Sequence, residues 1–165
     1  MRGRSQATIL KRHTKNSYTK YPYRDKLSSS GETPAIADVV WLGDSKEVLR
    51  AFPKGPQKDL GYALYQVQLG QSPPDSKPMR TVGPGVYELR EQDERAWYRV
   101  IYLKKVKSVV YVLHCFEKQT GQTEQRDINT ARDRLKRLQE QQRQDERIAK
   151  QKKQIANLSD KRKRP

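Results

Sequence analysis

The chain has 165 residues, 33% of them hydrophobic, and its 35 Lys and Arg residues against 19 Asp and Glu residues give a net charge of +16. This length is enough for one domain of ordinary size plus tails, and the charge favours RNA, DNA or the ribosome as a partner. The sequence has no apolar run suited to a signal-peptide core or a membrane span, and its single cysteine, Cys115, cannot form an internal disulfide. We therefore expect a cytoplasmic protein with no membrane contact, in which Cys115 is a buried, unreactive thiol.

The positive charge is concentrated at the two ends of the chain. Residues 1–35 contain eight Lys and Arg residues against two Asp and Glu residues, a net charge of +6, and they end in a Ser-, Gly- and Pro-containing stretch. Residues 136–165 contain eleven against four, a net charge of +7, whereas residues 36–135 carry only +3. Because residues 1–35 offer little apolar surface to bury, they are predicted to form a basic flexible arm.

A strand followed by two helices is predicted next. The apolar stretch 37–42 is typical of a strand, and Asp44 with Glu47 three residues later predicts a capping box at the start of a short helix over 45–52. Pro56 suits the first turn of a second helix, and Gly70 suits its C-terminal stop. The apolar residues of this second helix recur at helical spacing: Leu60, Ala63, Leu64 and Val67.

A loop, three strands and a last helix complete the predicted domain. Residues 71–84 are rich in Pro and Gly, which predicts a loop. The segments 85–90, 96–102 and 109–118 are rich in β-branched and aromatic residues, which predicts a three-stranded meander. A C-terminal helix is then predicted from an apolar stripe at spacings of three, four and three residues: Ile128, Ala131, Leu135 and Leu138.

The predicted domain organisation has three parts. The folded domain spans residues 36–138, after the arm over 1–35. Beyond Leu138 the apolar stripe stops while Gln, Lys and Arg continue, so residues 139–165 are predicted to be a basic, polar helical extension and tail, frayed from Lys161 onward.

This order of elements, together with the segments VYELR, WYRVIY and YVLHCFEK, resembles the bacterial toxin superfamily of RelE, HigB and ParE, and most nearly its phage-derived HigB-like branch. The resemblance covers roughly residues 39–138, including the LGYAL helix start and the Lys77-Pro78 loop. It implies an α+β fold in which a small antiparallel-rich sheet packs against two N-terminal helices and a C-terminal helix, with disordered or solvated basic tails. RelE and HigB members cut messenger RNA in the ribosomal A site and ParE members poison gyrase, so the individual residues must decide the activity.

Cationic strand residues are the candidate catalytic groups. Strand alternation places Glu88 and Arg90 on one face, with Arg99 on the neighbouring strand. Guanidinium groups suit phosphate oxygens and the extra charge that forms when a 2′-hydroxyl attacks a phosphate. The resemblance implies that Arg90 and Arg99 match phosphate-contacting residues of the ribonuclease members. It also implies that Lys118 or His114, near the end of the last strand, serves as an acid or a phosphate contact.

Two of these residues have more than one interpretation. Glu88 stands where RelE carries a lysine. It would either accept the 2′-hydroxyl proton or orient Arg90 or Arg99 through a salt bridge. His114 is either catalytic or a satisfied, half-buried histidine.

Substrate binding is predicted for residues around the meander. Lys77 and Arg80 form a basic rim at the end of the loop over 71–84. The terminal tyrosine that stacks on a base in RelE has no counterpart after Lys118. Tyr102 is our candidate substitute, with Tyr87 and Trp97 as alternatives. Strand aromatics also serve commonly as core residues.

The resemblance, taken together with these residues, implies a type II toxin that is a ribosome-dependent, metal-independent messenger RNA endoribonuclease. No cofactor or metal is predicted, because two distant histidines, one cysteine and no clustered carboxylates offer no ligand set. The resemblance implies a cognate antitoxin, of helix-turn-helix type, as partner. The alternatives are a ParE-like gyrase inhibitor and a non-catalytic protein on a toxin-like fold that binds nucleic acid or the ribosome through its basic arms.

Overall fold

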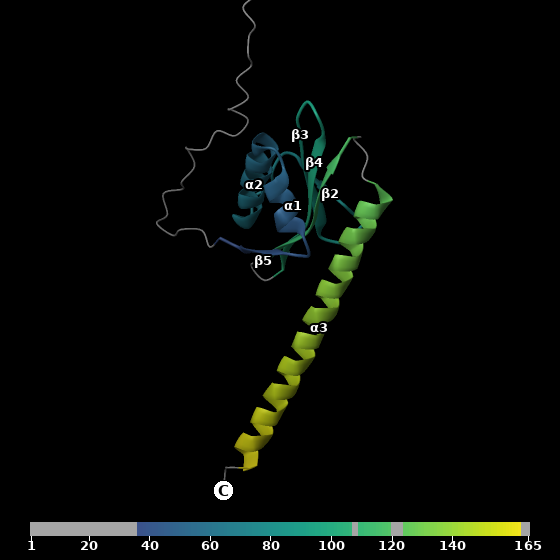
Figure 1. The fold of residues 1–165 in the computed structure, drawn as a ribbon. Coiled ribbons are helices and arrows are strands. Elements are labelled where there is room, and N and C mark those ends of the chain that lie inside the picture. Colours follow the sequence, from purple (N-terminus) through teal and green to yellow (C-terminus); the bar gives the residue numbers. More distant parts are fainter. Residues whose placement is uncertain (1–35, 107–108, 120–123, 163–165) are drawn as a thin grey trace, which may run out of the picture. The chain divides into compact units, whose positions relative to one another are not determined.

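The structure of the protein, a computed structural model, describes residues 36–106, 109–119 and 124–162 (Figure 1). The arm predicted over 1–35 lies outside the described residues, as do the last residues, 163–165. The elements in chain order are β1 (Asp38–Trp41), α1 (Ser45–Ala51), α2 (Lys54–Gln68), β2 (Ser76–Pro78), β3 (Val86–Gln92), β4 (Trp97–Val106), β5 (Val109–Lys118) and α3 (Gln125–Arg162).

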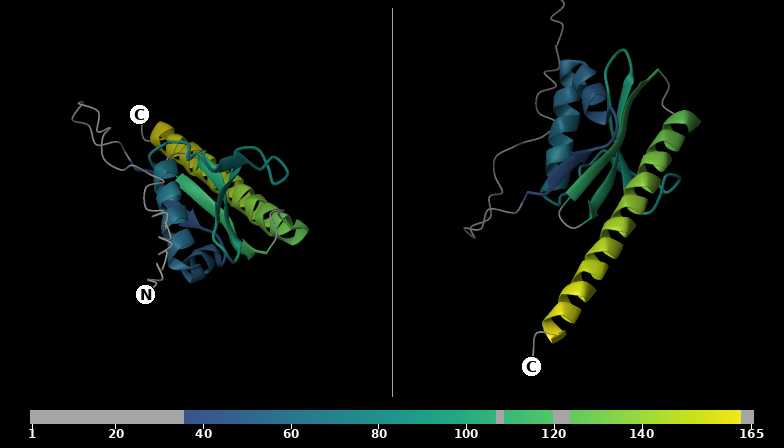
Figure 2. Two further views of the ribbon diagram at one scale, coloured as in Figure 1. Left: turned by 90° about the horizontal axis from the view of Figure 1, so that it is seen from above. Right: turned by 60° about the horizontal axis from the view of Figure 1, so that its bottom comes forward.

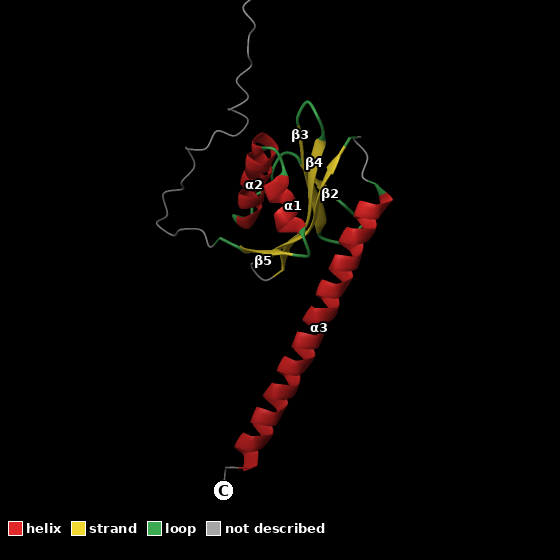
Figure 3. Cartoon of the chain, viewed as in Figure 1, coloured by secondary structure: helices red, strands yellow, loops and turns green. Residues whose placement is uncertain are grey.

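The strands form one five-stranded sheet in the order β1-β5-β4-β3-β2. β1 runs parallel to β5, and the other three pairs are antiparallel. Figure 3 shows the strands in yellow, between α1 and α2 on one side and α3 on the other. The predicted α+β fold with an antiparallel-rich sheet is confirmed, and each predicted helix and strand is present with ends shifted by a few residues.

Helices cover both faces of the sheet. α1 and α2 lie on one face and α3 lies on the other, as the two views of Figure 2 show. Because side chains alternate along a strand, β3 and β4 contribute to both cores: Leu89 and Val100 pack with the α1–α2 side, whereas Val86 and Ile101 pack with α3. The position of a strand residue therefore decides which helix it meets.

The ends of α1 and α2 follow the sequence signals in part. Gly70 has a φ of 78° directly after α2, which is the left-handed conformation predicted for a helix stop. The predicted capping box at Asp44 is wrong, since this side chain makes no cap hydrogen bond to α1. Its carboxylate instead accepts a hydrogen bond from Arg134 of α3, at 2.6 Å. The backbone of Asp44, with φ −89° and ψ 8°, also lacks the extended conformation typical of an N-cap residue.

The sequence analysis missed one strand, β2, which lies within the predicted loop over 71–84. β2 pairs antiparallel with β3, with Lys77 opposite Glu88, and it forms the edge of the sheet. An edge strand accommodates Pro78, which has no N–H to donate. The Oγ of Ser76 lies 2.9 Å from the phenol oxygen of Tyr102 and holds this short strand on the sheet.

The last helix, α3, is 38 residues long and passes the predicted domain end at Leu138 without a break. The predicted core stripe is confirmed: Ala131 and Leu135 are buried, and Ile128 and Leu138 pack against the same core. The chain was predicted to be frayed from Lys161 onward, but the helix includes Lys161 and ends at Arg162. Despite this length, neither α3 nor another helix in the described part of the chain is apolar enough to cross a membrane.

Cys115 lies in the core beneath α1 and α2, with 1% of its surface exposed. Burial raises the pKa of its thiol, so the thiolate form is strongly disfavoured. The predicted burial of Cys115 is confirmed.

Candidate phosphate-binding site

The strand register brings the predicted catalytic residues onto the α3 side of the sheet. Arg90 of β3 lies directly opposite Arg99 of β4, and Trp97 of β4 lies opposite Lys118 of β5. Glu88 is two residues from Arg90 and therefore shares its face, because side chains alternate along a strand. We call these five residues the cationic cluster. It contains three cationic side chains and one carboxylate.

Within the cationic cluster, Arg99 is held by two neighbours. Its Nη1 donates a hydrogen bond to Oε2 of Glu88 at 3.1 Å, and the two side chains are only 3% and 9% exposed. Its guanidinium carbon also lies 5.2 Å from the centre of the Trp97 ring, a cation–π distance. This geometry favours the second interpretation of Glu88, in which the carboxylate orients Arg99.

Lys118 is buried at the end of β5, with 3% of its surface exposed. Its Nζ has no hydrogen-bond partner within residues 36–106, 109–119 and 124–162, and the buried Nε of Arg90 has none there either. A buried ammonium group that lacks an acceptor has lost its hydration without compensation. The cationic cluster is therefore short of acceptors, which is the condition that an anion such as a phosphate group would relieve.

His114 lies on the same side of the sheet but in a separate network. Its Nε2 is 3.1 Å from Oδ1 of Asp127, and its Nδ1 is 3.4 Å from Nη1 of Arg134. Because a guanidinium group only donates, Nδ1 must be the acceptor and Nε2 must carry the proton that goes to Asp127. Both ring nitrogens are occupied, which favours the interpretation of His114 as a satisfied, half-buried histidine.

The pKa of His114 gives a testable pH dependence. Burial, together with the charge of Arg134, lowers this pKa below its ordinary value of 6.5, despite the opposing effect of Asp127 and Asp44. Below about pH 6.5 the unfolded chain therefore binds more protons than the folded chain, and the free energy of unfolding should fall as the pH decreases from 7.5 to about 5. His114→Gln, which cannot titrate, should show a shallower fall in urea unfolding experiments over this range. If the free energy of unfolding of His114→Gln fell with pH as steeply as that of wild type, the lowered pKa assigned to His114 would be contradicted.

Arg134 of α3 is a structural residue that the sequence analysis missed. Its Nη1 donates to the backbone oxygens of Leu42 and Leu113, at 3.2 and 3.0 Å, and its Nη2 donates to Asp44. The guanidinium lies so close to Gly43, whose φ is 59°, that a Cβ there would meet it at 2.5 Å. Arg134 thereby ties α3 to the residue that follows β1 and to the middle of β5. One arginine among many in a basic helix gave no sequence signal for this role.

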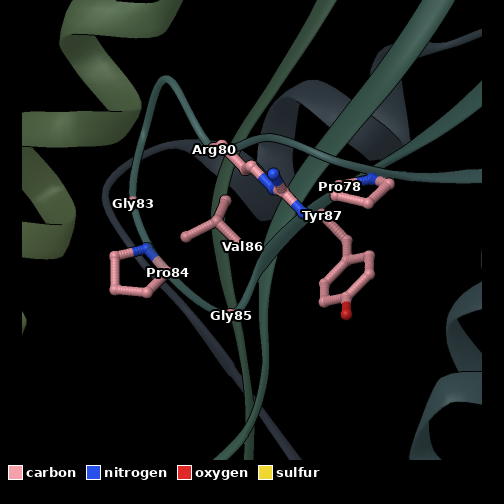
Figure 4. Close-up of a pocket in the computed structure, with 7 residues that line it drawn as sticks. All are labelled: Pro78, Arg80, Gly83, Pro84, Gly85, Val86 and Tyr87. Atoms are coloured by element: carbon pink, nitrogen blue, oxygen red, sulfur yellow. The ribbon is translucent and has the colours of Figure 1, made fainter.

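The two predicted basic-rim residues lie at the β2 edge of the sheet. Lys77 is exposed and shares a face with Glu88, its partner in the neighbouring strand. Arg80 is exposed and lines an open pocket of about 500 Å³ (Figure 4). The turn through residues 83–85 bounds this pocket on one side, and Pro78 and Arg80 bound it on the other. Both cations are thus available to an approaching polyanion.

The aromatic candidate Tyr102 does not join the cationic cluster. It is buried on the opposite, α1–α2 side of the sheet, where it stacks on Tyr87 with ring centres 5.9 Å apart. Burial raises the pKa of its phenol. The aromatic side chain that the fold brings to the cluster is Trp97, which is half-buried. Trp97 is one of the sequence-predicted alternatives to Tyr102, and strand alternation favours it because Trp97 is two residues from Arg99 whereas Tyr102 is three.

Metal ligands are not gathered in the described part of the chain. Within it, no group of three or more His, Cys, Asp or Glu side chains is placed to hold a metal ion. The cationic cluster itself contributes a single carboxylate, already paired with Arg99.

Comparison with known proteins places the chain in a family. The family described as "Phage derived protein Gp49-like (DUF891)" matches residues 47–136, which include the whole cationic cluster. No curated protein matches the chain. Among solved structures, a mutant of the E. coli toxin RelE in the free state is similar, with a TM-score of 0.45 and 17% identity over 62% of this chain and 98% of that chain. The resemblance to the phage-derived branch is confirmed by the family match, which spans more than half of the sequence: the chain belongs to the phage-derived Gp49-like family.

Proposed function

We propose that this protein is the toxin of a type II toxin–antitoxin system and that it cleaves messenger RNA on the ribosome without a metal ion. The observation that carries this proposal is the buried ammonium group of Lys118, which has no hydrogen-bond partner among the described residues and shares a face of the sheet with the Glu88–Arg99 pair. Such a group is costly to the fold unless an anionic ligand uses it. The family match and the likeness predicted from the sequence point to the same class of protein.

The proposed reaction is an internal transfer at one phosphate of the RNA. The 2′-oxygen loses its proton and bonds to phosphorus, the bond to the 5′-oxygen breaks, and that oxygen takes up a proton. The products carry a 2′,3′-cyclic phosphate and a 5′-hydroxyl. The charge that builds on the phosphate oxygens in the transition state would be stabilised by Arg90 and Arg99, with Lys118 placed to assist the leaving oxygen. Glu88, already engaged by Arg99, acts as a positioning residue.

Substrate orientation would supply the rest of the rate enhancement. Trp97 and Arg90 are only partly buried, so an RNA strand would approach the cluster past them. Trp97 suits stacking on an unpaired base, which an aromatic side chain does without sequence preference. Lys77 and Arg80 would contact the backbone on the β2 side.

Controlled expression of the full chain tests this function, with wild type beside Arg99→Ala and transcript 5′ ends mapped. We expect growth arrest and new ends within translated regions for the wild type alone. Arrest with broken DNA and intact transcripts would replace the proposal by gyrase inhibition. Neither arrest nor new ends would replace it by a non-catalytic binding protein. We further propose that a cognate antitoxin of helix-turn-helix type binds this protein in the cytoplasm, so that co-expression of such an antitoxin should restore growth.

RNA affinity should depend steeply on salt. Each phosphate contact on single-stranded RNA contributes about 0.7 to the slope of log K against log salt concentration. Lys77→Gln with Arg80→Gln should therefore reduce this slope by about 1.4, measured with a single-stranded RNA by fluorescence anisotropy. Lys46→Gln with Arg50→Gln removes two exposed charges from α1, on the other side of the sheet, and should leave the slope unchanged. Equal effects of the two pairs would exclude a specific basic rim.

A further inference from the structure

The C-terminal half of α3 carries an exposed apolar face. Towards its C-terminus, α3 still contacts the sheet at Gln142, whose side-chain amide donates a hydrogen bond to the Tyr111 hydroxyl at 3.3 Å. Beyond it the described side chains are exposed, and three of them are large and aliphatic: Ile148 is 49% exposed, Ile155 66% and Leu158 62%. A soluble helix gains nothing from three such residues in water, so their arrangement requires an explanation.

These three residues lie on one side of the helix. Ile155 follows Ile148 by seven residues and Leu158 follows by three more, the spacing of a coiled-coil seam. This side is not a continuation of the core stripe that ends at Leu138, because that stripe would continue on Gln142, Asp145 and Ala149 at steps of four and three. The aliphatic face is therefore separate from the one that packs on the sheet.

The surroundings of this face are basic. Residues 143–155 contain five Lys and Arg residues against two Asp and Glu residues. Arg147 and Lys152 flank the aliphatic face on its two sides, in the positions that face a partner helix in a coiled coil. A partner that buries the aliphatic residues and has acidic flanks would satisfy both features at once.

We propose that this face of α3, formed by Ile148, Ile155 and Leu158, docks an amphipathic helix of another protein that has an aliphatic stripe and acidic flanks. A second copy of the chain fits poorly, since parallel pairing sets Arg147 beside Lys152 of the copy and each chain carries a net charge of +16. RNA would use the basic side chains but leave the aliphatic residues in water. The face is distinct from the cationic cluster, so this proposal does not depend on the proposed nuclease activity.

Two synthetic peptides test the docking face with the full chain. One is a helix with Leu at the seam positions and Glu on both flanks, and the other has the same composition with its Leu residues spread around the helix. We expect the first peptide to bind at least tenfold more tightly in fluorescence anisotropy. Ile148→Gln with Ile155→Gln should abolish this preference, because Gln keeps the helix but removes the aliphatic contact. Ala149→Gln with Asn157→Gln is the matched control and should keep the preference.

Two results would overturn the proposed docking face, each in a different way. Equal binding of both peptides would show attraction by net charge alone and would overturn the proposal. Sedimentation showing a dimer that Ile148→Gln disrupts would assign the face to a second copy instead. Arg99→Lys, which keeps the charge, should bind the peptide as wild type does, whatever its effect on RNA cleavage.

Discussion

Lys118→Met is expected to make the protein more stable and less active. The substitution removes a buried ammonium group that has no described acceptor and retains the apolar stem, so the free energy of unfolding should rise by about 1–3 kcal/mol. The same change removes a cation from the proposed reaction centre and should lower RNA cleavage by about 100-fold. Urea unfolding and a cleavage assay on the same preparation measure both effects.

Lys104→Met is the matched control for this result. Lys104 is a half-buried lysine whose Nζ donates to Ser72 and lies 5.7 Å from the centre of the Tyr87 ring, so it is already satisfied. Its replacement should bring no gain in stability and no loss of cleavage. A lower stability for Lys118→Met would contradict our account, because the ammonium would then be serving the fold and not a ligand.

Arg99→Lys should lower RNA cleavage by about 10²–10³-fold, the cost of losing one preorganised group that stabilises transition-state charge. The lysine keeps the charge but cannot reproduce the planar fork that Glu88 and Trp97 hold in place. Single-turnover cleavage by wild type and variant measures the loss. Cleavage within a few-fold of wild type would remove Arg99 from the reaction.

Stability can be separated from activity at the same site. Arg99→Ala leaves Glu88 buried without this partner and is expected to cost about 3 kcal/mol or more of folding free energy. Arg99→Met combined with Glu88→Met replaces the buried pair by apolar side chains and should recover most of that loss while remaining inactive. An active double variant would contradict the roles assigned to both residues.

Local sequence signals predicted most of the fold because they agree with the tertiary structure. The spacing of Leu60, Leu64 and Val67 and the stop at Gly70 place α2, and alternation places the three long strands. The signals failed where a distant contact decides the outcome. β2 exists because β3 offers an edge to Lys77 and its neighbours. The carboxylate of Asp44, which was expected to cap α1, instead accepts a hydrogen bond from Arg134, ninety residues away.

The sequence predicts the part of the candidate site that follows from the alternation of side chains along strands. Glu88, Arg90 and Arg99 come together by alternation and register alone. The register of β5 against β4 brings Lys118 opposite Trp97, and only the pairing of the two strands could reveal this. The satisfied state of His114 depends on Asp127 and Arg134 of α3, a helix whose exact crossing of the sheet no local pattern specifies.

The chemical nature of the cut ends tests the central claim most directly. Purified full-length protein would be incubated with ribosomes translating a defined message, and the new ends would be analysed. Our account predicts a 2′,3′-cyclic phosphate on one fragment and a 5′-hydroxyl on the other, formed by wild type but not by Arg99→Lys, and blocked by a 2′-deoxy nucleotide at the cut position. Ends bearing a 5′-phosphate and a 3′-hydroxyl, or a message left intact, would contradict it.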